Sequence, residues 1–138
     1  MESVNPASIP SLCDGLGRQA DFRKAYPMIG HASFQRSVLA AHQIHVGSGV
    51  AGFLLEIKPS RGFHGFGDWE SLLMMYPEYQ RQGIGTLVIN QISETQVRSF
   101  FVSAKSNLAS TSFFHKQPML KLVDENERCR VYAPSNKR

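Results

Sequence analysis

The stretch MMYPEYQRQGIGTLV, residues 74–88, joins an apolar run to residues with helical spacing through a segment that contains two glycines. The apolar run stops at Pro77, and Gly83 and Gly85 stand directly before the helix-like residues. Glycine allows backbone angles and close approaches that other residues do not, and free N–H groups at a helix N-terminus bind anions such as phosphate. The stretch therefore predicts either a phosphate-binding loop between a strand and a helix or a simple glycine bend.

Two common phosphate-binding motifs do not fit this stretch. The Walker motif needs Lys and then Ser or Thr after its last glycine, whereas Gly85 is followed by Thr86 and Leu87. The dinucleotide-binding motif needs a third glycine where the chain has Val88. However, no acidic residue lies between positions 79 and 93, although ordinary helices favour Asp or Glu in their first turn. A helix N-terminus without acidic residues favours a bound anion such as pyrophosphate.

The composition of the whole chain is typical of one globular domain. The chain has 138 residues, of which 42% are hydrophobic and 19% are charged, so it can bury a core without disulfide bonds. We expect a single domain over residues 1–138. No apolar run approaches the ~20 residues of a membrane-spanning helix, and the opening MESVNPASIPS lacks the basic start and apolar centre of a signal peptide. The expected location is the cytoplasm, with no membrane partner.

The formal charge of +4 and the pI near 9.3 predict a mild attraction to anions. The basic residues are scattered along the chain, so a nucleic-acid partner is permitted but not favoured. Of the five histidines, His42 and His45 form the closest pair. This pair has no third ligand nearby in the sequence, so we expect no metal site.

The order of hydrophobic patterns predicts an α+β (α/β) fold with a mixed central sheet flanked by helices. We expect a glycine-rich loop over residues 58–68 and a helix over residues 33–43 with Ser33 as its N-cap. The other expected elements are helices within residues 5–18, 86–96 and 107–117, strands at 69–79 and 99–104, and hairpins at 43–57 and 121–134.

Residues 80–85, QRQGIG, match the Q/R-x-x-G-x-G/A signature of the GNAT superfamily, the acyl-CoA-dependent N-acetyltransferases. Residues 107–119, NLASTSFFHKQPM, are similar in spacing to the family's N-x-x-A-x-x-L-Y-x-K-x-G-F helix. The chain thus resembles this superfamily over most of its length. The resemblance implies a GNAT-like fold and the transfer of an acetyl group from acetyl-CoA to a primary amine of a small molecule or peptide. Only residues 1–4 precede the first helix, so the first strand should be very short or missing.

The resemblance also implies a set of cofactor-binding residues. In the family, amides of the glycine loop bind the pyrophosphate of coenzyme A, and the preceding strand pairs with the pantetheine arm. The positions that match are Met74, Met75, Tyr76, Arg81, Gln82, Gly83, Ile84, Gly85, Thr86, Asn107 and Phe114. Phe114 is a departure, because the family often has at this position a tyrosine that protonates the leaving thiolate. This puts the usual proton donor in doubt, and His115 on the same helix is a poor substitute.

The candidate catalytic residue is Glu70, because a carboxylate on the central strand often serves as the base in the family. Strand alternation places Glu70 with Leu72 and Met74 on one face, but a bulge would reverse the face. A strand-end carboxylate in solvent is the alternative for Glu70, and Glu56 is the next candidate base. Three alternative functions stay open: a GNAT-like enzyme that modifies nucleic acid, a non-catalytic acyl-CoA-binding module, and a plain α+β binding domain with a glycine bend.

Overall fold

The computed structural model describes residues 1–58, 69–80, 82–95, 99–104, 108–127 and 129–135. The glycine-rich loop expected at residues 58–68 lies outside the described residues from position 59 onward. No helix among the described residues is long and apolar enough to cross a membrane.

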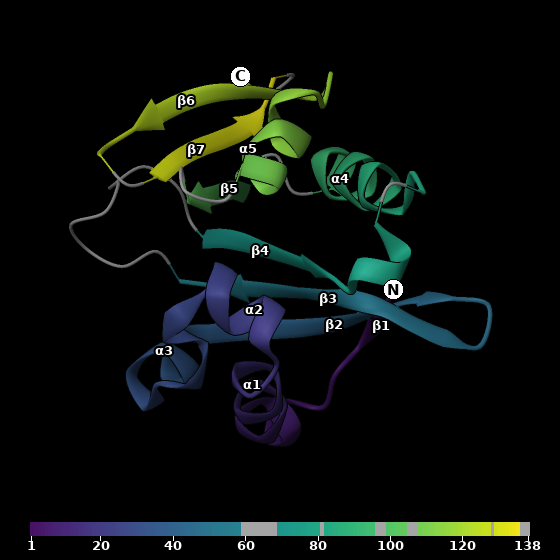
Figure 1. The fold of residues 1–138 in the computed structure, drawn as a ribbon, viewed down its shortest axis with the longest axis vertical. Coiled ribbons are helices and arrows are strands. Elements are labelled where there is room, and N and C mark those ends of the chain that lie inside the picture. The colour runs from purple at the N-terminus through teal and green to yellow at the C-terminus, as the bar shows by residue number, and fades with distance from the viewer. Residues whose placement is uncertain (59–68, 81, 96–98, 105–107, 128, 136–138) are drawn as a thin grey trace.

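The described part of the chain forms a seven-stranded mixed sheet with the order β1-β2-β3-β4-β5-β7-β6 (Figure 1). All neighbouring strands are antiparallel except β4 and β5, which run parallel. The first strand is only two residues long, which confirms the prediction of a very short strand at the N-terminus. The strands are β1 Glu2–Ser3, β2 Val38–Val46, β3 Gly49–Ile57, β4 Trp69–Met75, β5 Ser99–Ala104, β6 Leu120–Glu125 and β7 Cys129–Pro134.

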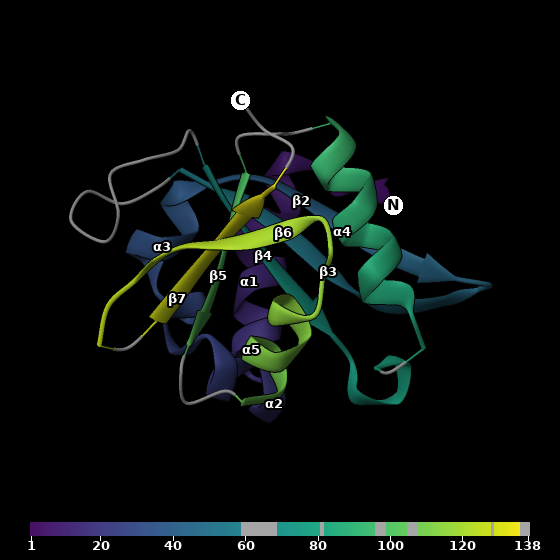
Figure 2. The same ribbon diagram turned by 90° about the horizontal axis from the view of Figure 1, so that it is seen from above.

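Helices cover both faces of this sheet (Figures 1 and 2). Helices α1 to α3 pack on one face, and α4 and α5 pack on the other. Short 3-10 turns precede α1, α3 and α4. The helices are α1 Ile9–Gly17, α2 Ala20–Ala25, α3 Ala32–Ser37, α4 Ile84–Thr95 and α5 Leu108–His115.

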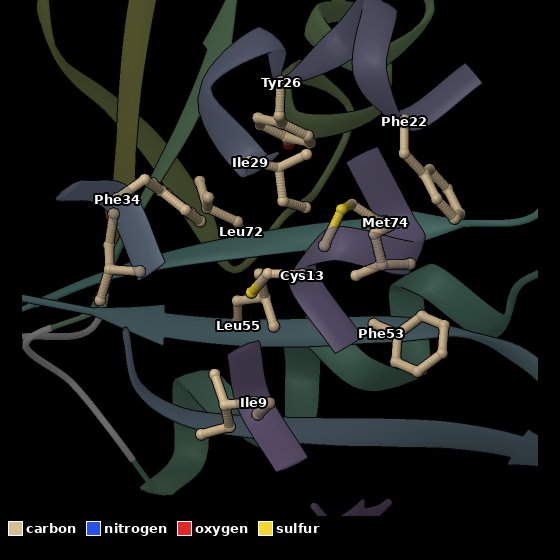
Figure 3. Packing of buried hydrophobic residues seen from close by; sticks show 13 residues of the cluster. Ile9, Cys13, Phe22, Tyr26, Ile29, Phe34, Phe53, Leu55, Leu72 and Met74 are labelled. Atoms are coloured by element: carbon tan, nitrogen blue, oxygen red, sulfur yellow. The ribbon is translucent and has the colours of Figure 1, made fainter. Parts of the chain in front are cut away.

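Strand β4 contributes to the hydrophobic core on both faces. Leu72 and Met74 pack with the residues of α1 to α3, as Figure 3 shows for that cluster. Leu73 and Met75 pack against the cluster that α4 and α5 cover. A strand that is covered on both faces carries apolar residues at successive positions instead of at every second one. This explains why the sequence WESLLMM predicts a central strand.

The predicted helix over residues 33–43 is wrong in its second half. Helix α3 begins at Ala32, follows His31 rather than a Ser33 cap, and ends at Ser37. Val38 already belongs to β2, which pairs with β3 along its length. The apolar spacing of these few residues fits a helix and a strand equally well, and the long-range pairing with β3 decides between them. The tight hairpin between β2 and β3 is confirmed, with Gly47 in its turn at φ 61°.

Strands β4 and β5 are joined only at one end. Trp69, Glu70 and Ser71 pair with the start of β5, while β4 continues to Met75 with β3 as its partner. The two parallel strands therefore diverge after Ser71 and leave one edge of β4 open. The candidate functional site lies at this opening.

Candidate functional site

A cavity of about 450 Å³ lies where β4 and β5 diverge. Its walls come from the end of β4, the loop before α4, helix α5 and, from the other face of the sheet, helix α2. The described lining residues are Leu73, Met74, Met75, Tyr79, Gln80, Gly83, Gly85, Thr86, Ala109, Ser110, Ser112, Phe113, Phe114, Lys116, Asp21, Phe22 and Tyr26. The cavity is therefore lined by residues of both sequence motifs, 80–85 and 107–119, and by residues of α2, which precedes both motifs in the chain.

The open edge of β4 presents the backbone of alternate residues to this cavity. The N–H of Tyr76 donates to the carbonyl oxygen of Ala51 at 2.9 Å, on the side of β3. Because adjacent residues of a strand point their backbone groups to opposite edges, Leu73 and Met75 face the opening. Their carbonyls accept hydrogen bonds there, from the Tyr26 hydroxyl at 3.5 Å and from the Gln80 side-chain amide at 3.0 Å. The backbone N–H groups of Leu73 and Met75 point the same way.

The glycine loop ends in an open helix N-terminus. Gly83 has φ 77°, and a Cβ built on it would meet nothing within 4 Å. The first helical hydrogen bond runs from the N–H of Leu87 to the carbonyl of Gly83 at 3.1 Å. The N–H groups of Ile84, Gly85 and Thr86 precede this bond and so have no partner within the helix. The first turn of α4 contains no acidic residue, which leaves the partial positive charge of the helix end uncompensated by side chains.

The glutamine side chains of the motif brace the loop. The Gln82 side-chain amide donates to the carbonyl of Glu78 at 2.8 Å, and that of Gln80 donates to Met75. The main-chain N–H of Gln80 is also used within this turn, since it donates to the carbonyl of Pro77 at 3.2 Å. Arg81, which the sequence also predicts to contribute an amide, lies outside the described residues.

Gly85 allows a close contact between the two motifs. A Cβ built on Gly85 would lie 2.8 Å from Cζ and 3.0 Å from Cε1 of Phe113. The ring of Phe113 on α5 therefore packs directly against the first turn of α4. Gly85 thus allows α4 and α5 to pack closely, while Gly83 leaves the helix end open.

Phe114 lines the cavity and is 2% exposed. Its ring stacks on that of Tyr132 with 5.7 Å between centroids and an interplanar angle of 24°, and it also contacts Phe101 and Phe113. The buried Tyr132 hydroxyl has no hydrogen-bond partner among the described residues. Asn107, predicted to approach the same region, lies outside the described residues.

Glu70 lies on the face of the sheet that α1 to α3 cover. The β3–β4 register runs without a shift from Gly52 opposite Met75 to Ile57 opposite Glu70, so no bulge changes the strand alternation there. Glu70 is 7% exposed, and burial raises the pKa of its carboxyl to about 7. The described residues that line the cavity do not include Glu70.

The alternative base Glu56 lies on the opposite face and is paired elsewhere. Its Oε2 is 3.2 Å from Nε2 of His42, and neither residue is among those that line the cavity. His45 pairs with Glu2 at 3.2 Å. Within the described residues, no group of three or more His, Cys, Asp or Glu side chains is arranged to hold a metal ion.

Helix α2 is the part of the site that the sequence reading missed. It places Asp21 and Phe22 on the cavity wall, and Tyr26, the residue that caps its C-terminal end, lines the same wall. The ring of Phe22 packs on that of Tyr76 with 5.1 Å between centroids. Burial, with a smaller contribution from Cys129, raises the pKa of Tyr26 to about 12, so its hydroxyl stays protonated and donates to Leu73. The two aromatic residues stand at helical spacing, and this was the signal available in the sequence.

The fold is similar to those of solved acetyltransferases. A GNAT-family acetyltransferase from Listeria monocytogenes has TM-score 0.62 and 11% identity, covering 94% of this chain and 90% of that chain. A spermidine N-acetyltransferase from Vibrio cholerae has TM-score 0.60 and 10% identity, and the match covers 96% of this chain and 93% of that chain. An aminoglycoside acetyltransferase in complex with coenzyme A and kanamycin has TM-score 0.63 and 8% identity, and the match covers 95% of this chain and 90% of that chain.

These similarities rest on structure, because no protein-family model matches the sequence and no curated protein matches it. The mixed sheet, the helices on both of its faces and the glycine loop before α4 agree with the fold that the sequence motifs implied. The chain has the fold of the GNAT acetyltransferases.

Proposed function

We propose that this chain is an N-acetyltransferase that moves an acetyl group from acetyl-CoA to a primary amine. The observation that carries the proposal is that one cavity meets both the open edge of β4 and the acid-free N-terminus of α4. A strand edge binds an amide-bearing chain by adding a strand, and a helix N-terminus binds a diphosphate. Coenzyme A contains both groups.

The chain offers a fitting group for each part of acetyl-CoA, which supplies the activated acetyl group as a thioester. The amides of residues 82–86 would hold the pyrophosphate, with Gly83 leaving space for it. The N–H groups of Leu73 and Met75 would pair with the pantetheine arm, because the carbonyls of these two residues already accept from Tyr26 and Gln80. Met74 would contribute its side chain to the cavity wall, whereas the backbone of Tyr76 pairs with β3.

The transfer needs a neutral amine and a route for its proton. We propose Glu70 as the base, since a pKa of about 7 suits proton transfer near neutral pH. Glu70 and Met74 lie on the same face of β4 and are separated by roughly 13 Å along the strand. Because Glu70 does not line the cavity, proton transfer from the amine to Glu70 would need a chain of several water molecules.

The departure of coenzyme A needs less help from the protein than the removal of the amine proton does. Coenzyme A leaves as a thiolate whose conjugate acid has a pKa of ~8.5, taking cysteine as the reference. Such a group leaves near neutral pH with little help from an acid. This agrees with a phenylalanine, Phe114, at the position of the family's tyrosine.

Two solved structures support an amine as the acceptor. The aminoglycoside acetyltransferase was solved with coenzyme A and kanamycin, and the spermidine N-acetyltransferase was solved with coenzyme A and spermine. Both second ligands carry amines. We propose a small-molecule or peptide amine for this chain as well.

Calorimetric titration of acetyl-CoA into the Gly83→Asp variant tests the cofactor site. The aspartate places a side chain and a negative charge at the open helix end, so we expect at least a 10-fold loss of affinity, the scale of a charge-assisted hydrogen bond. Gly47→Asp is the matched control. Gly47 has φ 61°, and it too has no atom within 4 Å of an added Cβ, but it lies in the β2–β3 turn, away from the cavity. Equal acetyl-CoA affinity of the two folded variants would overturn the assignment of this loop.

A transfer assay distinguishes catalysis from binding alone. Amines, peptides and DNA are offered with acetyl-CoA, and released thiol is measured. Release that depends on an amine supports the proposal, and release that depends only on DNA would identify a nucleic-acid-modifying enzyme. Tight acetyl-CoA binding without release for any acceptor would identify a non-catalytic binding module.

A further inference from the structure

The side chain of Tyr79 lies between the cavity and the turn of the β2–β3 hairpin. Tyr79 ends the 3-10 turn Pro77–Tyr79, which connects the end of β4 to the glycine loop. It lines the cavity, and it packs against the hydrophobic cluster that α4 and α5 cover. Its hydroxyl reaches Gly49, the first residue of β3. One side chain thus contacts both the candidate cofactor site and a hairpin that contributes none of the described lining residues.

Gly49 leaves the space that the Tyr79 hydroxyl occupies. A Cβ built on Gly49 would overlap this hydroxyl and would lie 3.6 Å from Cζ of the same ring, whereas the carbonyl oxygen of Val46 would be 3.7 Å away. Gly49 pairs with Val46 at the start of the hairpin ladder and lacks the positive φ of Gly47. The close approach of Tyr79, and not the backbone conformation, therefore requires glycine at this position.

Other contacts of the segment between β4 and α4 run within the segment itself. The N–H of Tyr79 donates to the carbonyl of Tyr76 at 3.0 Å, and the Gln82 side chain donates to the carbonyl of Glu78 at 2.8 Å. Hydrogen bonds of this kind shape the turn without joining it to the hairpin. Tyr76 ties the start of the segment to Ala51 of β3, and the ring of Tyr79 then supplies a contact with the hairpin just before the glycine loop.

We propose that Tyr79 is a positioning residue for the glycine loop, and that its contact with Gly49 determines where the loop lies relative to the sheet. The inference rests on the proposed acetyl-CoA site and adds a determinant outside that site. The amides of residues 82–86, which would hold the pyrophosphate, follow Tyr79 closely in the chain. A shift of Tyr79 is therefore carried to them. Tyr79 acts through these amides and takes no part in the transfer itself.

Gly49→Ala tests the contact, because the added Cβ displaces the end of the Tyr79 ring toward the cavity. The displaced atom is the far end of a side chain that can turn, so we expect the variant to fold. Its acetyl-CoA affinity, measured by calorimetry, should fall by at least about 5-fold, within the range for coupling between residues in contact. Removing the hydroxyl should restore binding. Gly49→Ala in a Tyr79→Phe background should bind acetyl-CoA within about 2-fold of Tyr79→Phe alone.

Gly47→Ala is the matched control for a loss of hairpin stability. Gly47 lies in the same turn with φ 61°, so a side chain strains the backbone there, but its added Cβ would have no atom within 4 Å. The variant should weaken the hairpin and keep acetyl-CoA affinity within about 2-fold of wild type. An equal loss of affinity in Gly47→Ala and Gly49→Ala would overturn the inference, because hairpin stability alone would then control the loop.

A shortened ligand separates a displaced loop from a general loss of structure. S-acetylpantetheine keeps the thioester and the amide-bearing arm but lacks the diphosphate. Its affinity, measured by ligand-observed NMR, should be the same in Gly49→Ala and the wild type. Tyr79→Leu, which shortens the side chain away from Gly49, tests the contact from the other side and should also weaken the binding of acetyl-CoA but not of S-acetylpantetheine.

Three results would overturn the inference and leave the acetyl-CoA site standing. These are an unchanged acetyl-CoA affinity in Gly49→Ala or Tyr79→Leu, a parallel loss for both ligands, and a loss in Gly49→Ala that Tyr79→Phe does not restore. A wild-type chain that does not bind acetyl-CoA would overturn both the inference and the proposed function.

Discussion

The hydroxyl of Tyr26 donates a 3.5 Å hydrogen bond to the carbonyl oxygen of Leu73, and this bond crosses from α2 to the strand edge that β5 leaves open. A buried carbonyl at such an edge lacks its partner in the sheet. Tyr26 supplies one from a helix that lies far earlier in the chain. The same contact holds α2 against the cavity and gives the site its third wall.

Replacing Tyr26 by Phe should weaken this wall and leave the fold intact. The lost hydrogen bond is long, so we expect a loss of about 1 kcal/mol in the free energy of unfolding. We also expect a several-fold rise in KM for acetyl-CoA, because the bond holds the Leu73 backbone that would pair with the pantetheine arm. Chemical denaturation, calorimetry and steady-state kinetics measure these quantities. A variant with wild-type kinetics would show that the bond does not position this edge of β4.

Replacing Gly85 by Ala should disturb the contact between α4 and α5. The added Cβ would lie 2.8 Å from the Phe113 ring, and forced overpacking of this kind costs about 1–3 kcal/mol. We expect the free energy of unfolding to fall by that amount and acetyl-CoA affinity to fall with it. In a Phe113→Leu background the same substitution should cost less. Equal costs in the two backgrounds would show that Phe113 is not the neighbour that excludes a side chain at Gly85.

The glycine motif and the central strand could be predicted from sequence because their signals are local. Residues 80–85 show the loop directly, and the apolar run before Pro77 is too dense for a half-exposed strand. The alternation of Leu72 and Met74 against Leu73 and Met75 also follows from strand geometry alone, and the structure confirms it.

The parts that sequence reasoning missed depend on long-range contacts. Val38 joins a strand because β3 lies beside it, and nothing within residues 33–43 shows this partner. Helix α2 has only six residues, too few for a clear period, and its side chains reach the site only once α2 packs near Tyr76. The open edge of β4 depends on where β5 stops pairing, which no local pattern determines.

Burial of Glu70 should make the stability of the protein depend on pH. Its pKa rises from 4.5 to about 7 on folding, so between these pH values the folded state holds a proton that the unfolded state has lost. The free energy of unfolding should therefore decrease as pH rises from about 4.5 to 7, by at most about 3 kcal/mol, and then level off. Glu70→Gln should flatten this part of the curve. Urea denaturation of both proteins at several pH values measures the effect, and parallel curves would show that Glu70 does not titrate in this range.

Glu70→Gln also tests the proposed base. If Glu70 accepts the amine proton through water, the variant should lose ~10²-fold in turnover at neutral pH while acetyl-CoA affinity is unchanged. The wild-type rate should rise with pH through about 7, as the carboxyl ionises, and the variant should lack this rise. Glu56→Gln serves as the comparison, since Glu56 lies on the other face and pairs with His42. Equal rates of Glu70→Gln and wild type from about pH 6 to 9 would remove Glu70 from the mechanism.

Replacing Phe114 by Tyr would restore the hydroxyl that the family often carries at this position. Phe114 lines the cavity and stacks on Tyr132, so the ring itself is already accommodated and the change adds one oxygen. If that oxygen reaches the leaving sulfur, acetyl transfer should become a few-fold to ~10²-fold faster, the low end of general-acid effects.

Two control variants show whether such a gain comes from position 114. Phe113→Tyr adds the same hydroxyl to a neighbouring ring that also lines the cavity, and it should give no gain because that ring packs on Gly85. His115→Ala should change little, since His115 is exposed and is not among the lining residues. Single-turnover transfer to a confirmed amine measures all three variants. A large loss in His115→Ala with no gain in Phe114→Tyr would place the proton donor on His115. A Phe114→Tyr protein destabilised by more than about 2 kcal/mol, the scale of an unsatisfied buried hydroxyl, would instead show that the ring edge at position 114 points into the core and away from the sulfur.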